Sequence, residues 1–279
     1  MMKGREVCLL VVVALLTACA NGPGALPDSG GKPFEVLVVD DSDNLLTRLL
    51  QVDAEGLPQR EPSFDVSRVA SPQWKGSLRL ARAIVVRDTS RTMRREVDRY
   101  ARPQLIVYTD GRDGKRLLAL LQEFELRVAT EWLRQRHNAK MEETIRQMFG
   151  VSVLIPSDMN SARRGKDFLW LSDNKASPMR NVCIYKGVNR DSVMRQNVKG
   201  ETDSMYVQTV KGTVKERPLP GGGVYRYGLW EMKGDAMGGP FASVTRQGVT
   251  IEAFVYAPGG KKRNLMRQLD AVLYSLRTQ

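Results

Sequence analysis

Alternation of apolar and polar positions predicts that the first part of the chain mixes strands with helices. Residues 44–52 place four leucines on one helical face, which is the pattern of a short amphipathic helix. Short runs rich in Val, Ile and Leu indicate strands at residues 34–39, 64–69, 83–87 and 104–109. The expected order is therefore a strand, a helix and three further strands.

The longest helical pattern extends from about residue 114 to about residue 148. Leu117, Leu121 and Phe124 keep helical spacing, and Met141 and Ile145 resume it farther along the chain. A continuous helix of this length would measure roughly 50 Å, which is longer than a domain of this size needs. We therefore expect the helix to overhang, bend or break in its polar interval, residues 134–140.

After Gly150 the pattern changes to a succession of strands that a helix closes. The final helix, residues 261–277, carries a continuous apolar stripe, and a helical crossover is expected at residues 189–197. The expected strands are residues 151–155, 168–171, 182–185, 205–210, 224–232, 240–246 and 250–257. Adjacent strands followed by a helix are typical of an antiparallel sheet with helices on one face.

These patterns together predict an α+β fold. We expect antiparallel sheets with helices packed on one face, one long central helix and a C-terminal helix. Residues 33–149 should form an N-terminal α/β half that contains the long helix, and residues 150–279 a C-terminal antiparallel α+β half.

Residues 1–18 have the features of a lipoprotein signal peptide. Lys3 and Arg5 precede an apolar run of ten residues, Val7–Leu16, whereas a membrane-spanning helix needs roughly 20. The run ends in Leu16-Thr17-Ala18-Cys19, which is a lipobox. We therefore expect cleavage before Cys19 and lipidation of that residue, with palmitate among its acyl chains.

Lipidation at Cys19 would hold the protein at the cell envelope through a membrane anchor. Two or more acyl chains bind a membrane stably, whereas a single chain binds only reversibly. Ala20 follows the cysteine in place of aspartate, which favours the outer membrane, and we expect the folded body to face the periplasm. Residues 19–32 are rich in Gly and Pro and should form a flexible tether.

The chain is basic, with a formal net charge of +12. A basic cytosolic protein would raise nucleic acid as a partner, but an exported protein meets acidic envelope polymers and anionic lipid head groups instead. We therefore expect no nucleic acid partner, and the candidate partners are an envelope protein and an acidic envelope polymer. The densest basic cluster, residues 87–102, also contains acidic residues, as an ordinary solvated surface does.

Three features suggest chemistry, and each has a plainer interpretation. Val36-Leu37-Val38-Val39-Asp40-Asp41-Ser42 resembles the start of a response-regulator receiver domain, but export would separate the chain from kinase and ATP, and a helix cap at Ser42 or Asp43 is simpler. His137, the only histidine, is expected to be an exposed residue of the long helix. Cys183 alternates with apolar neighbours, as a small buried thiol does. We therefore assign no catalytic residue, no metal site and no cofactor.

The segment 227–241 is the candidate ligand or partner loop. Its glycines permit a tight turn and close approach of the backbone, and its bulky apolar residues are unusual for a loop in water. Two interpretations stay open: a contact surface built on a rigid turn, or a hairpin whose Met237 and Phe241 close the end of the core. The candidate residues are Trp230, Asp235, Met237, Gly238, Gly239, Pro240 and Phe241.

Five segments carry a resemblance to a known family: Lys32–Val39, Gly56–Phe64, Ala101–Gln104, Gly228–Trp230 and Met237–Phe241. Together they resemble the domain of unknown function 4837 proteins of Gram-negative envelopes. The resemblance implies a tethered envelope protein and supplies no reaction. The C-terminal half is also weakly similar to PsbP/DcrB-type domains, which implies a non-enzymatic α+β module.

These inferences predict a lipid-anchored periplasmic protein that acts as a non-catalytic binding or assembly module of the cell envelope. The alternative is an envelope hydrolase that acts on glycan or lipid. Paired carboxylates could cleave a glycosidic bond, but the sequence singles out no pair.

Overall fold

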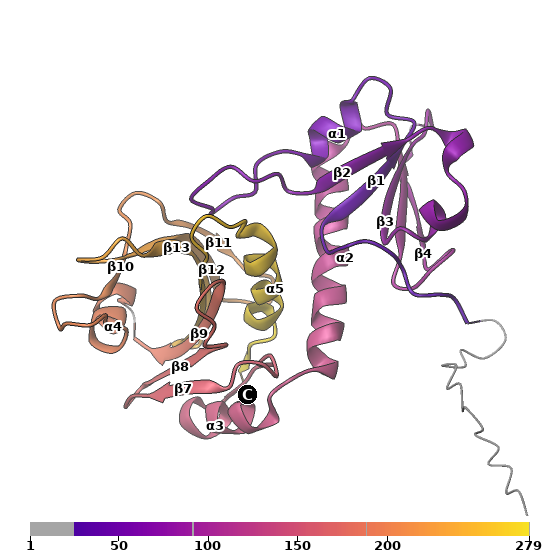
Figure 1. The fold of residues 1–279 in the computed structure, drawn as a ribbon. Helices are drawn as coiled ribbons and strands as arrows, with labels where there is room; N and C mark the ends of the chain where they lie inside the picture. The colour runs from indigo at the N-terminus through magenta and orange to yellow at the C-terminus, as the bar shows by residue number, and fades with distance from the viewer. Residues whose placement is uncertain (1–24, 91, 188, 279) are drawn as a thin grey trace, which may run out of the picture.

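The computed structural model describes residues 25–90, 92–187 and 189–278, which form two lobes joined by a long helix, α2 (Figure 1). The N-terminal lobe comprises residues 25–113 together with α2 (Gly114–Gln135), and the C-terminal lobe comprises residues 139–278. The segments predicted to be a signal peptide and the start of a tether, with the expected lipidation site Cys19, lie outside the described residues. Within those residues, no helix combines the length and the apolar character that a membrane span requires.

The N-terminal sheet is largely parallel, with strand order β2-β1-β3-β5-β4. Only the edge strand β4 runs antiparallel to its neighbour. The prediction of antiparallel sheets therefore applies to the C-terminal lobe alone. The strands are β1 (Glu35–Val39), β2 (Asp65–Val69), β3 (Ala83–Arg87), β4 (Arg94–Val97) and β5 (Leu105–Thr109).

Both faces of this sheet are covered, as a parallel sheet requires. Val36 and Val38 pack toward α1 (Leu45–Leu50) and α2, while Leu37 and Val39 pack on the other face, where Trp74 lies. Two short 3-10 segments, η1 (Ser71–Gln73) and η2 (Gly76–Leu80), flank that second face. Apolar residues therefore succeed one another along β1 without the polar alternation of a half-exposed strand.

The long helical pattern is interrupted inside the interval that the sequence indicated. Helix α2 ends at Gln135, and α3 (Ala139–Phe149) begins after Asn138, whose side-chain oxygen accepts a hydrogen bond from the Met141 amide at 3.2 Å. Of the three outcomes that the sequence left open, an overhang, a bend or a break, the structure shows a break. His137 lies in the break and not on a helix, which corrects the expectation, and its Nδ1 is 3.0 Å from the Glu142 carboxylate.

The C-terminal lobe contains an antiparallel sheet of order β10-β12-β13-β14-β9-β8-β7, with β11 paired to β12. A small separate ladder joins β6 (Val151–Ser152) to β15 (Arg277–Thr278). The strands are β7 (Ser161–Arg164), β8 (Phe168–Ser172), β9 (Met179–Lys186), β10 (Val207–Thr209), β11 (Lys215–Pro218), β12 (Val224–Met232), β13 (Gly238–Arg246) and β14 (Val249–Tyr256). The α+β class is confirmed.

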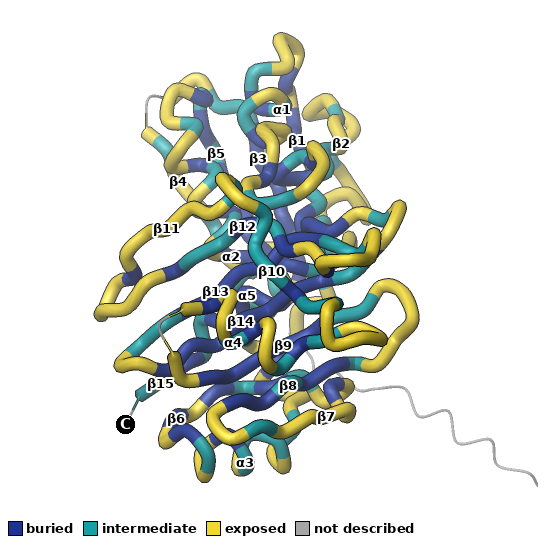
Figure 2. Tube along the Cα trace, turned by 90° about the vertical axis from the view of Figure 1, so that its left-hand side faces the viewer, coloured by how far each residue is buried: buried dark blue, intermediate teal, exposed yellow. Residues whose placement is uncertain are grey.

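Helices contact both faces of the C-terminal sheet. Helix α5 (Arg263–Tyr274) buries Leu269, Val272 and Leu273 in one core, to which α3 adds Ile145 and Phe149. Helix α4 (Arg190–Asn197) places Met194 in the core on the other face. The expectation that helices cover one face alone is therefore too narrow. Figure 2 shows the buried residues following the strands of both sheets, with exposed residues at the turns.

The two lobes interlock through an extended loop of the N-terminal lobe. Glu61 in this loop is buried, and its carboxylate accepts hydrogen bonds from the backbone amides of Lys262 (2.7 Å) and Arg263 (3.0 Å). A carboxylate at this place stabilises the helix, because it satisfies free amides and opposes the positive end of the helix dipole. Arg263 completes the contact with an ion pair to Asp65 at 2.6 Å. One lobe thus caps a helix of the other.

Candidate functional site

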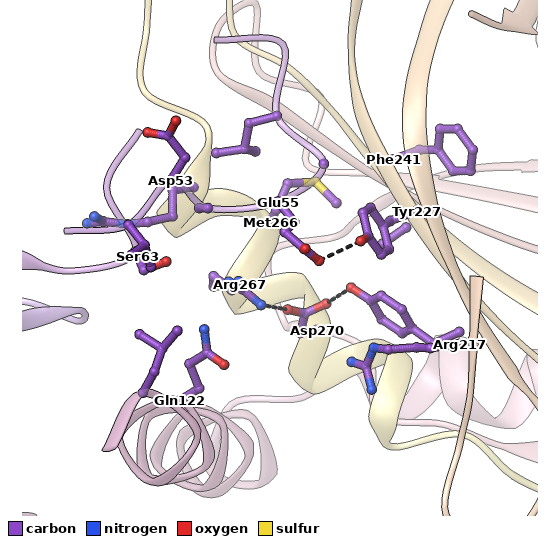
Figure 3. A pocket seen from close by; sticks show the side chains of 18 residues that line it. Asp53, Glu55, Ser63, Gln122, Arg217, Tyr227, Phe241, Met266, Arg267 and Asp270 are labelled. Carbon is purple, nitrogen blue, oxygen red and sulfur yellow. Dashed lines mark hydrogen bonds and ion pairs between the residues drawn. The ribbon is translucent and has the colours of Figure 1, made fainter. Parts of the chain in front are cut away.

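A cleft of about 590 Å³ lies where the two lobes meet (Figure 3). Its walls come from the loop at residues 52–57, from α2, from the hairpin β11–β12 and from α5. Because these elements are far apart in the sequence, the cleft exists only when the lobes are docked. Boundaries between domains are common positions for ligand sites, so this cleft is the candidate site.

A buried carboxylate forms the floor of the cleft. Asp270 lies one helical turn after Arg267 on α5, and the guanidinium Nη1 of Arg267 is 3.5 Å from Oδ2 of Asp270. The hydroxyl of Tyr225 donates a hydrogen bond to Oδ1 at 2.7 Å. Burial raises the pKa of Asp270, and Arg267 and Tyr225 only partly oppose that rise. Burial, together with the nearby Asp270 charge, raises the pKa of Tyr225 well above its usual range.

The mouth of the cleft carries a second tyrosine–carboxylate pair. Tyr227 is two residues after Tyr225 on β12 and therefore points to the same side of the strand. Its hydroxyl donates a hydrogen bond to Oε2 of Glu55, which belongs to the N-terminal lobe. Burial and then Glu55 raise the pKa of Tyr227 to about 12. This bond spans the seam between the lobes.

The mouth also carries two exposed charged residues that form no ion pair with the described residues, although the charge of Arg217 acts on Asp270. Arg217 on β11 stacks on the ring of Tyr225 at 4.4 Å and donates a hydrogen bond to the Tyr274 hydroxyl, but no carboxylate among the described residues lies within ion-pair distance of it. Glu55 likewise has no cation within ion-pair distance in the described part of the chain. By contrast, Arg263 is paired with Asp65. The site can therefore receive an anion at Arg217 and a donor group at Glu55.

The sequence-based candidate loop lies mostly in the core. Trp230 is 2% exposed and Phe241 1% exposed, and the Arg190 guanidinium lies 3.9 Å from the centre of the Phe241 ring. Gly239 and Pro240 are also buried, and Gly238 and Met237 are partly buried. This burial favours the hairpin interpretation, in which Met237 and Phe241 close the core. Of the candidate residues only Asp235 is exposed, and only Phe241 reaches the cleft.

Gly239 has a structural reason to be glycine. A Cβ atom at this position would lie 2.1 Å from the carbonyl oxygen of Val255 on the neighbouring strand β14. Any side chain would push the two backbones apart. The glycine therefore serves the sheet, and it does not indicate a ligand.

Cys183 is a fully buried thiol, as expected. Burial raises its pKa well above the usual range, so the sulfur stays protonated and unreactive. Next to it, Glu252 accepts hydrogen bonds from the Tyr185 hydroxyl at 3.0 Å and from Nη2 of Arg190 at 2.7 Å. Glu252, Tyr185 and Cys183 are enclosed in the core, whereas the nearly buried Arg190 also pairs with the half-exposed Asp191 and borders an open surface pocket. Among the residues that the structure describes, no group of three metal-ligating side chains is brought together.

Apart from Phe241, the residues that line the cleft were not identified from the sequence. One signal was present: Asp270 falls within the apolar stripe of the last helix, between Leu269 and Val272, where a charged residue needs an explanation. A second was the pair Tyr225 and Tyr227 at strand spacing. Neither signal identifies Glu55, because its contact with Tyr227 joins positions 172 residues apart.

Two family models match the chain, and their ranges correspond approximately to the two lobes. Residues 138–275 match the model of the family described as Domain of unknown function (DUF4837). The C-terminal lobe is the part of the chain that is similar to this family. Residues 29–149 match a second model, Domain of unknown function (DUF8532). The three N-terminal segments that carried the resemblance to the first family, residues 32–39, 56–64 and 101–104, therefore fall in the range of the second.

Solved structures provide similarities at low sequence identity. The solution structure of cyanobacterial PsbP (CyanoP) from Synechocystis sp. PCC 6803 is 16% identical, with 47% of this chain and 87% of that chain covered and a TM-score of 0.29. A crystal structure from Bacteroides thetaiotaomicron VPI-5482 is 14% identical, with 46% and 45% covered and a TM-score of 0.22. None of the curated proteins matches the chain.

Proposed function

We propose that the protein is a lipid-anchored binding or assembly module of the cell envelope, and that the cleft between the lobes is its binding site. The anchor would be Cys19, in the outer membrane, with both lobes in the periplasm. The partner would be an envelope protein or an acidic envelope polymer. The sequence of the first 18 residues supports the anchor, and the cleft supports the binding role.

The observation that carries the binding role is the pair of exposed charged residues at the cleft mouth that form no ion pair with the described residues. Arg217 and Glu55 each share a hydrogen bond with a tyrosine hydroxyl. A ligand with an anionic group could form a charge-assisted hydrogen bond with Arg217, which is stronger than a neutral one. The tyrosine rings beside it offer a flat, rigid contact surface.

Photo-crosslinking in intact cells tests this role. A photoreactive amino acid at Gln122, which lines the cleft, should trap one defined envelope component. Val97, exposed on β4 in the N-terminal lobe, is the matched control position and should give no such adduct. Substitution Arg217→Gln should abolish the Gln122 adduct in a protein that still folds. Identical adducts from both positions, or an adduct unaffected by Arg217→Gln, would contradict the proposal.

The anchor has a separate test. Mass spectrometry of the mature N-terminal peptide should show acyl chains on Cys19, and Cys19→Ser should release the protein from the membrane fraction. An unmodified thiol in the native protein would contradict the anchor and would leave the assignment of the cleft intact.

A hydrolase is the second candidate, because three carboxylates line the cleft: Asp53, Glu55 and Asp270. A carboxyl group with a raised pKa is suited to act as a general acid, and the pKa of Asp270 is raised. Purified protein screened against peptidoglycan, glycans and lipid esters separates the two functions. Turnover that Asp270→Asn or Glu55→Gln abolishes would favour the enzyme, and absence of turnover would favour the binding module.

A further inference from the structure

A second cavity, of about 610 Å³, lies farther along the same face of α2, toward the C-terminal end of the helix. The last turns of α2 form one wall, and residues 33–34, which lead into β1, form another. The loop at residues 156–158 and helix α5 complete it. It shares no lining residue with the cleft described above.

The walls of this second cavity are mainly apolar. Phe34, Val128, Leu133 and Leu269 contribute side chains to it. Trp132 stands at its rim with 58% of its surface exposed, more than any other large apolar residue that the structure describes. An exposed tryptophan beside an apolar cavity leaves hydrophobic surface in water, and such surface often marks a binding site.

The charges that line the cavity are neutralised, with one exception. Arg82 pairs with the buried Glu125 at 2.5 Å, and Arg180 pairs with both Asp158 and Asp173. Arg136 is the exception: its guanidinium lies 4.2 Å from the centre of the Trp132 ring, and no described carboxylate is within ion-pair distance of it. The cavity thus combines an apolar interior with a single free cation at its mouth.

We propose that this second cavity binds a free single-chain amphipathic anion, namely a fatty acyl chain with a carboxylate head group. The chain would lie against Val128, Leu133 and Leu269, and the carboxylate would meet the Arg136 guanidinium beside Trp132. The proposal rests on the shape, polarity and charge of the cavity. It does not depend on the function assigned to the cleft.

Calorimetric titration of the purified full chain with sodium dodecanoate tests the proposal. Dodecanoate should bind with one site per chain. Dodecyltrimethylammonium, which has the same chain and a cationic head, should bind at least tenfold more weakly, because Arg136 would repel it. Equal affinity for the two head groups, or no saturable binding of dodecanoate, would overturn the proposal. So would binding to phospholipid vesicles in place of monomeric dodecanoate.

Three variants locate the bound chain. Ala129→Phe places a ring in the cavity and should abolish binding, and Arg136→Gln should weaken it at least fivefold. Arg134→Gln is the matched control, because Arg134 is exposed on the same helix and pairs with Glu131 outside the cavity. It should bind dodecanoate as the native chain does.

Circular dichroism establishes that each variant is folded. Arg136 is exposed, so Arg136→Gln remains informative even where Ala129→Phe disturbs the helix. Unchanged dodecanoate affinity in Arg136→Gln would overturn the proposal. The cleft variant Arg217→Gln should also bind dodecanoate normally, so a failure of one site is distinguishable from a failure of the other.

Discussion

Two clusters of buried charge lie on opposite faces of the C-terminal sheet, and they differ in where the positive partner is placed. In the first, Glu252 and Arg190 are both inside the core, 0% and 6% exposed. In the second, Asp270 is buried at 6%, but the side chain of its partner Arg267 is 29% exposed in the cleft. Both carboxylates also accept a hydrogen bond from a buried tyrosine.

The comparison separates a structural cluster from a candidate binding cluster. A buried charge with a buried counter-charge has little contact with solvent or ligand, and removal of one partner leaves the other unpaired. A buried carboxylate whose partner stands partly in water can respond to whatever enters the cleft. We therefore expect substitutions in the Arg190–Glu252 cluster to affect stability, and substitutions at the cleft mouth to affect binding.

The largest effect should come from Arg190→Leu. This change leaves Glu252 without its counter-charge in the core, and breaking a buried ion pair in this way costs about 3–5 kcal/mol. Chemical denaturation followed by circular dichroism measures the free energy of unfolding. The double variant Arg190→Leu with Glu252→Gln should recover part of the loss. A loss below about 1 kcal/mol in the single variant would mean that the cluster is not structural.

The second largest effect should come from Phe241→Ala, because this change removes a fully buried ring. The free energy of unfolding should fall by at most about 3–5 kcal/mol. Asp235→Ala, in the same hairpin but exposed, is the control and should change stability by less than about 0.5 kcal/mol. A folded Phe241→Ala variant of native stability that loses a partner would instead support the contact interpretation of this loop.

A smaller effect, with a defined pH dependence, should come from Asp270→Asn. Burial raises the pKa of Asp270 in the folded state above its ordinary value of 3.8, so the folded protein holds this proton more tightly than the unfolded chain does. The charged carboxylate therefore lowers stability at neutral pH. This penalty decreases once the pH falls below the folded-state pKa, and it is gone below the unfolded pKa.

The Asn variant should consequently be more stable than the native protein at neutral pH. The difference should shrink as the pH falls from the raised folded-state pKa toward the ordinary aspartate value, and it should be absent below that value. Thermal unfolding at a series of pH values measures it, and Asp235→Asn, exposed, serves as the control. An Asn variant that is less stable at neutral pH would mean that the bond to Arg267 outweighs desolvation.

The smallest effect on stability should come from Arg217→Gln, because the side chain is exposed and has no carboxylate partner among the described residues. We expect a change within about 0.5 kcal/mol together with loss of the cleft adduct. A large destabilisation would assign Arg217 a structural role through Tyr225 and Tyr274, and the distinction between the two clusters would fail.

Elements with a clear pattern could be predicted from the sequence. The strand expected at residues 224–232 has the bounds of β12, and the interruption of the long helix falls in its polar interval. Apolar periodicity decides such elements, because one face of each is buried.

Strands β4, β7 and β11 could not be predicted, because their residues are polar. They are rich in arginine, lysine and glutamate and are largely exposed at the edges of their sheets. Such segments become strands because they pair with a neighbouring strand. Charged residues are common in them because they protect the exposed edge of a sheet. The parallel order of the N-terminal sheet was likewise missed, because pairing between distant segments leaves no local pattern.

The cleft could not be predicted for the same reason, because contacts between distant segments form it. Tyr225 and Asp270 are 45 residues apart, and Tyr227 and Glu55 are 172 apart in different lobes. Folding of the C-terminal lobe brings Tyr225 to Asp270, and docking of the lobes, with Glu61 capping α5, brings Glu55 to Tyr227. Residue spacing within one segment could not reveal such a site.

Hydrogen–deuterium exchange of the full chain tests the assignment of the cleft most directly. Exchange would be compared between purified protein and protein in its native membranes. The account predicts slower exchange in the membranes at residues 215–227 and 263–270, with no change in the N-terminal sheet, and loss of this protection in Arg217→Gln. Equal exchange in the two preparations across the cleft would contradict it.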